Sequence, residues 1–129
     1  MRFLLDTHVW MWLLESPQRV RAPVRELLEQ ADELVLSVAS IWELGIKLKL
    51  GKVTLRKELE ATCDEIFREA GARELAITSA HALAASVLPP LHRDPFDRML
   101  IAQATSEGLV LVTADAAIRQ YGTVIEWAI

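Results

Sequence analysis

The sequence predicts an α/β protein with a parallel sheet of about four to five short strands, sandwiched by helices. Short apolar segments alternate along the chain with longer segments of helical pattern. The apolar segments show little polar–apolar alternation, which is typical of strands buried on both faces. A chain of 129 residues has the usual size of one domain. We therefore expect a single domain over residues 1–129.

The first quarter of the chain predicts two strands and two helices. An apolar strand is expected at residues 2–5, and a helix follows over residues 8–14 because Ser16 and Pro17 end its pattern. A second helix is expected over residues 21–31, with a proline that its first turn tolerates. Residues 34–38 are apolar and predict a buried strand.

The middle of the chain predicts two helices that each end at a glycine, and one short strand. The first helix covers residues 40–50 and ends at Gly51, and the second covers residues 56–70 and ends at Gly71. The strand is expected at residues 74–77. Helices and strands therefore continue to alternate as a parallel sheet requires.

The last third predicts three helices and two strands. A helix over residues 79–87 ends before two prolines, and a helix over residues 95–107 ends at a glycine. Residues 109–113 form the most strand-like segment of the chain. A short helix over residues 116–121 and a strand over residues 123–127 complete the fold.

Four acidic residues stand where a site is expected. Asp6 and Asp115 each follow a predicted strand, Asp97 opens a helix, and Glu43 lies one turn into another helix. Ligands of parallel α/β folds bind beyond the carboxyl ends of the strands, so we expect the four carboxylates to converge there. Converging carboxylates repel one another unless a hard divalent cation such as Mg²⁺ or Mn²⁺ lies between them. Such a cation activates water toward phosphorus chemistry, which makes the four acids candidate metal ligands and catalytic residues.

Each acid also has a purely structural interpretation. Asp6 and Asp115 are placed to cap the helices that follow them, and Asp97 occupies a capping-box position behind Asp94. Glu43 is spaced to pair with Lys47 one helical turn later. These interpretations stay open from the sequence alone.

Four blocks of sequence resemble those of PIN-domain nucleases, and they occur in the family's order. They are LLDTH at 4–8, SVASIWELGIK at 37–47, HRDPFDRMLIAQA at 92–104 and LVLVTAD at 109–115. Each block is centred on one of the four acids or ends at it. The form of the third block looks most like the VapC-type toxins of toxin–antitoxin pairs.

The resemblance implies a metal-dependent endoribonuclease that acts on RNA, binds a cognate antitoxin protein and forms a homodimer. Asp6, Glu43 and Asp97 match the family's three core acids, and Asp115 matches the fourth. Trp10 and Trp12, in an apolar first helix, suggest a physical reason for the dimer. Two alternatives remain, an RNA-processing PIN nuclease outside a toxin pair and a catalytically inactive interaction module.

Basic residues supply candidate contacts to RNA, although the net charge of the chain is −4. The segment between Glu43 and Glu58 carries no acid but several lysines, and two arginines flank Asp97. The candidates are Lys47, Lys49, Lys52, Arg93 and Arg98. Arg98 is also spaced for an ion pair with Asp94.

Three further expectations concern ligands and location. We expect no histidine among the metal ligands. The longest unbroken apolar run extends only from Val9 to Leu14, so we expect no membrane span. We expect the chain to lie in the cytoplasm.

Overall fold

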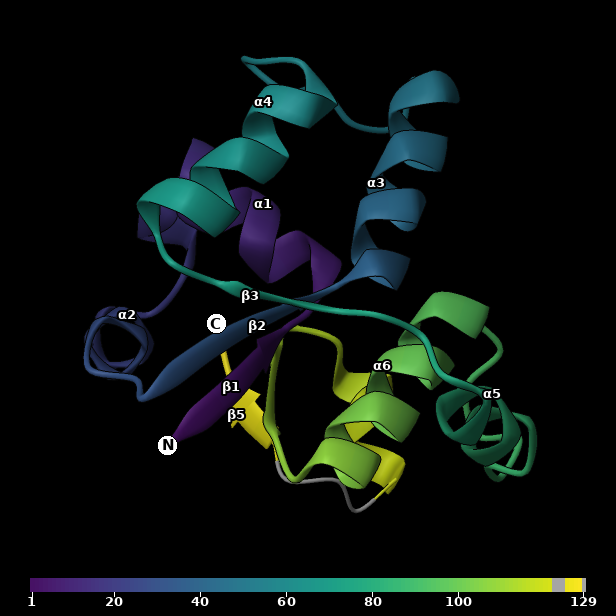
Figure 1. The fold of residues 1–129 in the computed structure, drawn as a ribbon. Coiled ribbons are helices and arrows are strands. Elements are labelled where there is room, and N and C mark those ends of the chain that lie inside the picture. The colour runs from purple at the N-terminus through teal and green to yellow at the C-terminus, as the bar shows by residue number, and fades with distance from the viewer. Residues whose placement is uncertain (122–124, 129) are drawn as a thin grey trace.

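Five parallel strands form one sheet in the computed structural model, which describes residues 1–121 and 125–128. The strands follow the order β3-β2-β1-β4-β5 across the sheet (Figure 1). Their bounds are β1 (Arg2–Leu5), β2 (Glu33–Ser37), β3 (Arg73–Leu75), β4 (Val110–Thr113) and β5 (Ile125–Trp127). The predicted fold class, a parallel sheet covered by helices, is confirmed.

Helical segments connect the strands. The α-helices are α1 (Thr7–Glu15), α2 (Ala22–Glu29), α3 (Val38–Lys49), α4 (Leu59–Asp64), α5 (Ser79–Ser86) and α6 (Pro95–Glu107). Three shorter segments are the 3₁₀-helical η1 (Pro17–Arg19), the π-helical η2 (Glu65–Glu69) and the 3₁₀-helical η3 (Ala116–Tyr121). Helix α6 ends as predicted at Gly108, whose positive φ of 66° suits a residue without a side chain.

Consecutive strand residues bury their side chains in two separate hydrophobic cores, one on each face of the sheet. In β1, Phe3 and Leu5 join the core beneath α1, α2 and α3, whereas Leu4 joins the core beneath α6. In β2, Leu36 joins the first of these cores and Val35 joins the second. This division explains why the strands are apolar throughout, since neither face meets water.

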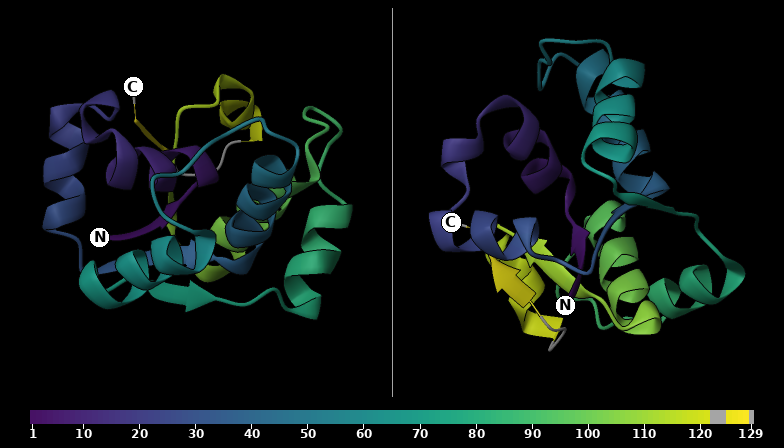
Figure 2. Two further views of the ribbon diagram at one scale, coloured as in Figure 1. Left: turned by 90° about the horizontal axis from the view of Figure 1, so that it is seen from above. Right: turned by 60° about the vertical axis from the view of Figure 1, so that its left-hand side comes forward.

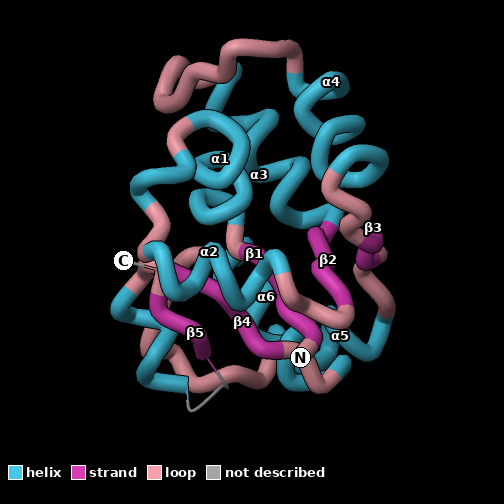
Figure 3. Tube along the Cα trace, turned by 90° about the vertical axis from the view of Figure 1, so that its left-hand side faces the viewer, coloured by secondary structure: helices cyan, strands magenta, loops and turns pink. Residues whose placement is uncertain are grey.

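The helix predicted over residues 56–70 differs from the observed one at both ends. It begins only at Leu59, because the backbone N–H of Arg56 donates to Oε1 of Glu15 on α1 instead of entering a helix. Its last turn widens to the π-helical η2. Figure 2 shows α3 and α4 side by side, and Figure 3 shows the loop that joins them at the end of the molecule.

The other predicted bounds differ by a few residues. The strand predicted at 34–38 ends at Ser37, whose hydroxyl accepts from the backbone N–H of Ala39 and so starts α3 earlier than predicted. The strand predicted at 74–77 is Arg73–Leu75, and the helix predicted at 21–31 is Ala22–Glu29. In the strand predicted at 123–127, residues 123 and 124 lie outside the described residues.

The apolar first helix is a core element, which corrects the reason given for a dimer. Trp10 is fully buried in the larger core. Trp12 is half-buried, with the guanidinium of Arg19 stacked 4.3 Å from its ring centroid. The two tryptophans of α1 therefore pack against other residues of this chain.

The strand order creates a switch point between β1 and β4. The chain moves outward from β1 through β2 to β3 and then returns to place β4 on the other side of β1. The crevice at the carboxyl ends of two such strands is the usual ligand site of this fold class. Among the described residues, no helix has the length and apolar character needed to cross a membrane.

Candidate active site

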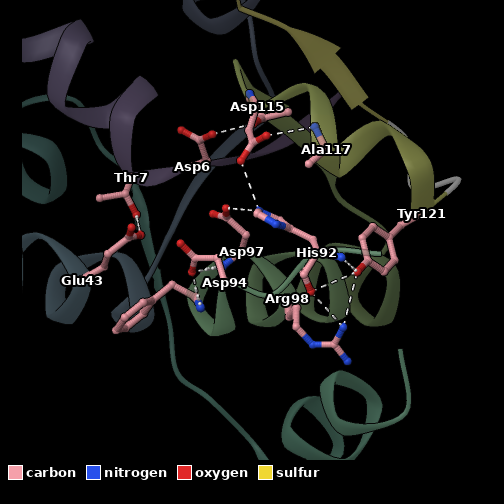
Figure 4. A network of polar contacts seen from close by, with 12 residues as sticks. Asp6, Thr7, Glu43, His92, Asp94, Asp97, Arg98, Asp115, Ala117 and Tyr121 are labelled. Atoms are coloured by element: carbon pink, nitrogen blue, oxygen red, sulfur yellow. Dashed lines mark hydrogen bonds and ion pairs between the residues drawn. The ribbon is translucent and has the colours of Figure 1, made fainter. Parts of the chain in front are cut away.

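A cavity of about 320 Å³ opens at the carboxyl ends of β1 and β4. All four acids predicted as ligands contribute to its lining. Figure 4 shows these side chains directed toward one another from different elements. The lining residues include Asp6, His8, Trp12, Glu43, Lys47, His92, Asp94, Asp97 and Asp115.

Asp6 is buried at the end of β1 and is held by two hydrogen bonds. Its Oδ1 accepts from the backbone N–H of Val9 at 2.9 Å, which caps α1, and its Oδ2 accepts from the hydroxyl of Thr113 at 2.5 Å. Burial raises the pKa of Asp6 above its ordinary value, against the effect of these hydrogen bonds. The capping interpretation is therefore correct for Asp6 and does not exclude it from the site.

Glu43 enters the cavity from α3 and has only 3% of its surface exposed. Its Oε1 accepts from the hydroxyl of Thr7 at 2.6 Å, and its Oε2 lies 2.8 Å from Nζ of Lys47. The pairing with Lys47 that the spacing suggests is present. Because Lys47 also lines the cavity, Glu43 and its partner both belong to the site.

His92 lies at the centre of the acidic group. Its Nε2 is 2.7 Å from Oδ2 of Asp97 and 3.2 Å from Oδ2 of Asp115 (Figure 4). One ligand atom from each of the three residues lies within 4.8 Å of the other two. Asp115 also accepts from the backbone N–H of Ala117 through Oδ1, so its predicted capping role is present as well.

The carboxylates depress one another's ionisation. Burial and the negative charges of Asp94, Glu43 and Asp6 together raise the pKa of Asp97 to about 7, against the lowering effect of the contact with His92. Burial lowers the pKa of His92, but its contacts with Asp97 and Asp115 leave it above the ordinary value. A divalent cation would relieve this repulsion, so the donor set fits a hard cation with oxygen ligands.

Asp94 has the structural role that its position suggests. Its Oδ1 accepts from the backbone N–H groups of Phe96 and Asp97, at 2.8 and 3.2 Å, and so caps α6. Pro95 occupies the first turn of that helix, as is usual. The cap fixes the start of α6 and thereby the direction of the Asp97 side chain.

Arg98 was a candidate RNA contact, and the structure corrects this. Its Nη2 donates to the carbonyls of Ala85 and Leu88, at 3.0 and 2.9 Å. Its Nη1 donates to the carbonyl of Pro89 at 3.0 Å and to that of His92 at 3.3 Å. The guanidinium thus joins the end of α5 to the loop before α6, instead of facing substrate or pairing with Asp94.

Three of the four remaining basic candidates line a cavity, and one does not. A second cavity of about 320 Å³ lies beside the acidic one and shares Glu43, Lys47 and Asp94 with it. Lys52 and Arg93 line this second cavity. Lys49 is exposed on α3 but is not among the residues that line either cavity.

His92 is the site residue that the sequence does not reveal. The sequence places it five positions before Asp97, in a loop rich in prolines, where it has no helical or strand register to fix its direction. The available signal was its position at the start of the third acidic block. The turn that brings it back over Asp97 depends on tertiary contacts with Arg98 and Tyr121.

The fold and the site together define a parallel α/β protein with a cluster of acidic side chains, suited to binding a cation, at the switch point of its sheet. The PIN domain family profile matches residues 3–124, so the chain belongs to the PIN-domain family. The resemblance carried by the four sequence blocks is thereby confirmed.

Relatives and solved structures agree with this assignment. The chain is 31% identical to Ribonuclease VapC22 of Mycobacterium tuberculosis over 119 residues, which are 92% of this chain and 90% of the relative. Its fold is similar to that of VapBC2 from Rickettsia felis bound to a promoter DNA fragment, with a TM-score of 0.76, 15% identity and complete coverage of both chains. The DNA-bound VapBC of Salmonella typhimurium matches with a TM-score of 0.69 and 18% identity, over 98% of this chain and 97% of the other.

Proposed function

We propose that this chain is a divalent-metal-dependent endoribonuclease that cleaves RNA phosphodiester bonds and acts as the toxin of a toxin–antitoxin pair. The observation that carries the proposal is the convergence of Asp6, Glu43, Asp97 and Asp115 on one cavity in a PIN-domain chain. The similarity to a ribonuclease supports RNA as the substrate. We further propose that the chain acts in the cytoplasm.

The four acids would hold Mg²⁺ or Mn²⁺. A bound cation of this kind supplies Lewis acidity and lowers the pKa of water. Asp97 and Asp115 face each other across His92 and present one oxygen each to the centre. Asp6 and Glu43 lie behind them and are held by Thr113 and by Lys47, so their carboxylates are oriented before substrate arrives.

RNA would lie along the two joined cavities. The acidic cavity supplies the reaction centre, and Lys47, Lys52 and Arg93 supply positive charge to the phosphates beside it. Trp42 is 66% exposed and packs edge-on against Phe96 of the second cavity, at 5.4 Å between ring centroids. An exposed aromatic ring at this place is suited to stacking on an unpaired base.

A cognate antitoxin and a second copy of the chain are the proposed protein partners. Similar folds occur in VapBC structures from several bacteria, which supports an antitoxin partner. An apolar cavity of about 430 Å³ between α1 and α2, remote from the acids, offers a binding surface. The homodimer is proposed through α5, where Leu83 is exposed, together with the exposed Val87 that directly follows this helix.

Cleavage of a defined single-stranded RNA by the purified chain tests the proposed activity. We expect cleavage with Mn²⁺ or Mg²⁺, none with EDTA, and a drop on the order of a hundredfold or more for Asp97→Asn and for Asp6→Asn. Both variants should bind Mn²⁺ more weakly in calorimetry while retaining the circular dichroism of the folded chain. Cleavage by the wild type that survives EDTA, or full activity in both variants, would contradict the proposal.

Growth of a bacterial host tests the toxin role separately. Induction of the wild-type gene should arrest growth, and the Asp97→Asn gene should not. Relief of the arrest by the small gene that overlaps or precedes it would identify the antitoxin. Normal growth with an active enzyme would favour the alternative, an RNA-processing nuclease outside a toxin pair.

A further inference from the structure

We propose that His92 is a nitrogen ligand of the bound cation and that it makes this centre favour a transition ion such as Mn²⁺ over Mg²⁺. The inference rests on the proposed metal-dependent function and adds a residue that neither the four acids nor the family assignment supplies. One imidazole nitrogen of His92 lies between the carboxylates of Asp97 and Asp115.

The distances match the edges of a coordination octahedron. Adjacent ligand atoms in an octahedron with bonds of 2.1 Å lie about 3.0 Å apart. Nε2 of His92 lies 2.7 Å from Oδ2 of Asp97 and 3.2 Å from Oδ2 of Asp115, and the three atoms lie within 4.8 Å of one another. A single small cation can therefore contact all three with little movement of the chain.

The loop that carries His92 is fixed by its own contacts. The backbone N–H of His92 donates to the hydroxyl of Tyr121 at 2.7 Å, and its carbonyl accepts from Nη1 of Arg98 at 3.3 Å. The same tyrosine donates to the carbonyl of Pro89 at 2.9 Å. Holding a loop backbone on both sides of one residue orients its side chain before the ligand binds, as ligands of metal sites require.

The remaining acids are more strongly engaged with protein groups. Asp6 accepts hydrogen bonds at both oxygens, and Glu43 contacts Thr7 and Lys47 at its two oxygens. His92, Asp97 and Asp115 form the group that already has coordination distances. An incoming cation would therefore meet one nitrogen and two oxygens first.

A nitrogen ligand changes which cation is preferred. Mg²⁺ selects carboxylate, carbonyl and water oxygens, whereas imidazole binds first-row transition ions well. Removing the imidazole should therefore lower the affinity for Mn²⁺ more than the affinity for Mg²⁺. A histidine that only bridges the two acids by hydrogen bonds would be displaced on loading and would produce no such difference.

Pulsed electron paramagnetic resonance of the Mn²⁺-loaded protein detects a coordinated imidazole directly, through the modulation that its ¹⁴N nucleus imposes on the electron spin echo. The chain has three histidines. His8 lines the same cavity beside Trp12, whereas His81 is buried with its Nε2 on Glu107, away from the cavity. The matched variants are therefore His92→Gln and His8→Gln, and the second is the control.

We expect ¹⁴N modulation in the wild type and in His8→Gln, and its loss in His92→Gln. Calorimetry should show a fall of at least about tenfold in Mn²⁺ affinity for His92→Gln, with a smaller fall for Mg²⁺. Wild-type protein that binds Mn²⁺ without ¹⁴N modulation, or a His92→Gln protein that keeps it, would overturn the inference and leave the metal centre intact. Wild-type protein that binds no Mn²⁺ would overturn both this inference and the proposed metal-dependent function. If His92→Gln fails to fold, the wild-type and His8→Gln spectra decide, because modulation that persists without His8 leaves His92 as the histidine that lines the cavity.

Discussion

The hydroxyl of Thr113 at the end of β4 donates a 2.5 Å hydrogen bond to the Asp6 carboxylate at the end of β1. The hydroxyl oxygen of Thr113 also accepts a hydrogen bond from the backbone N–H of Asp115 at 3.0 Å. One threonine thus sets the distance between the first acid and the last along the chain. The bond also opposes the rise in the pKa of Asp6 that burial causes.

Replacing Thr113 with valine should therefore weaken cation binding without emptying the core. Valine keeps the shape, but Asp6 loses its hydrogen bond and its pKa rises further, so protons compete better with the metal. We expect a roughly tenfold lower Mn²⁺ affinity at pH 7 for Thr113→Val by calorimetry, in the range of losses seen when an outer partner is removed. Thr113→Ser, which keeps the hydroxyl, is the control. Equal affinity of the two variants would show that the bond does not tune Asp6.

The pair formed by Glu43 and Lys47 separates catalysis from stability. Lys47→Met leaves a buried carboxylate without its cation partner, so we expect a loss on the order of 1–3 kcal/mol in the free energy of unfolding. Glu43→Gln leaves Lys47 without its carboxylate partner, but Lys47 has 25% of its side chain exposed and can turn to water. The free energy of unfolding of this variant should therefore change less. Its RNA cleavage with Mn²⁺ should fall on the order of a hundredfold or more.

Melting without metal and cleavage with Mn²⁺ are measured for both variants of this pair. A Glu43→Gln protein that is strongly destabilised and fully active would assign Glu43 to structure alone. The two readouts are needed together, because a drop in activity alone follows from either role.

The pKa shifts predict how the stability of the metal-free chain depends on pH. The pKa of Asp97 is raised from 3.8 to about 7, and the pKa values of Asp6 and His92 are also raised. The folded chain therefore holds protons that the unfolded chain has lost. The contribution of these residues to the free energy of unfolding is fully present below about pH 4, and it is lost as the pH rises through about 7.

Thermal melting in EDTA at pH 6 and pH 8 tests this dependence. We expect a lower Tm at pH 8, by roughly 4 °C for each kcal/mol lost in a domain of this size. Asp97→Asn should flatten the dependence, and Mn²⁺ should raise the wild-type Tm more at pH 8 than at pH 6. A Tm that rises from pH 6 to pH 8 in EDTA would contradict the charge repulsion inferred for the site.

The second cavity should contribute measurable phosphate contacts. Each lost contact should reduce the slope of log affinity against log salt by about 0.7 for single strands. For Lys52→Ala with Arg93→Ala we therefore expect a slope reduced by about 1.4, measured by RNA binding in EDTA. Arg56→Ala is the control, since the Arg56 guanidinium binds Glu15 and the carbonyl of Leu14. An equal reduction in the control would relocate the RNA path toward α1.

The homodimer is tested by two exposed apolar residues, one on α5 and one directly after it. Leu83 and Val87 are 68% and 81% exposed, and charge at both should be unfavourable in an apolar interface. We expect Leu83→Glu with Val87→Glu to halve the mass measured by light scattering at micromolar concentration. Leu27→Glu on α2, where the leucine is 38% exposed, should leave the mass unchanged. A monomeric wild type would exclude the dimer.

The sequence predicts the sheet and the meeting of the four acids at its edge, because both depend on local patterns. Apolar strands followed directly by Asp6 and Asp115 place those residues at the sheet edge without any knowledge of packing. Glu43 is singled out because its helix is apolar on more than one face, so that its carboxylate is expected to be buried. The carboxyl-edge rule then joins elements that are distant in the chain.

The parts that the sequence does not predict depend on tertiary contacts. Arg98 is spaced for an ion pair, but the open carbonyls at the end of α5 and in the following loop bind it instead. His92 lies in that loop, and its direction is set by Tyr121. The burial of Trp10 depends on how α1 lies on the sheet, which the apolar composition of the helix does not fix.

The bond between Asp6 and Thr113 joins residues 107 positions apart, so this part of the acidic cavity cannot form from either half of the chain. During synthesis β1 leaves the ribosome long before its neighbour β4. A growing chain therefore cannot form the bond between Asp6 and Thr113 until the segment that contains β4 has emerged. The order in which these strands are made therefore sets the earliest point at which the carboxylates of the cavity can come together.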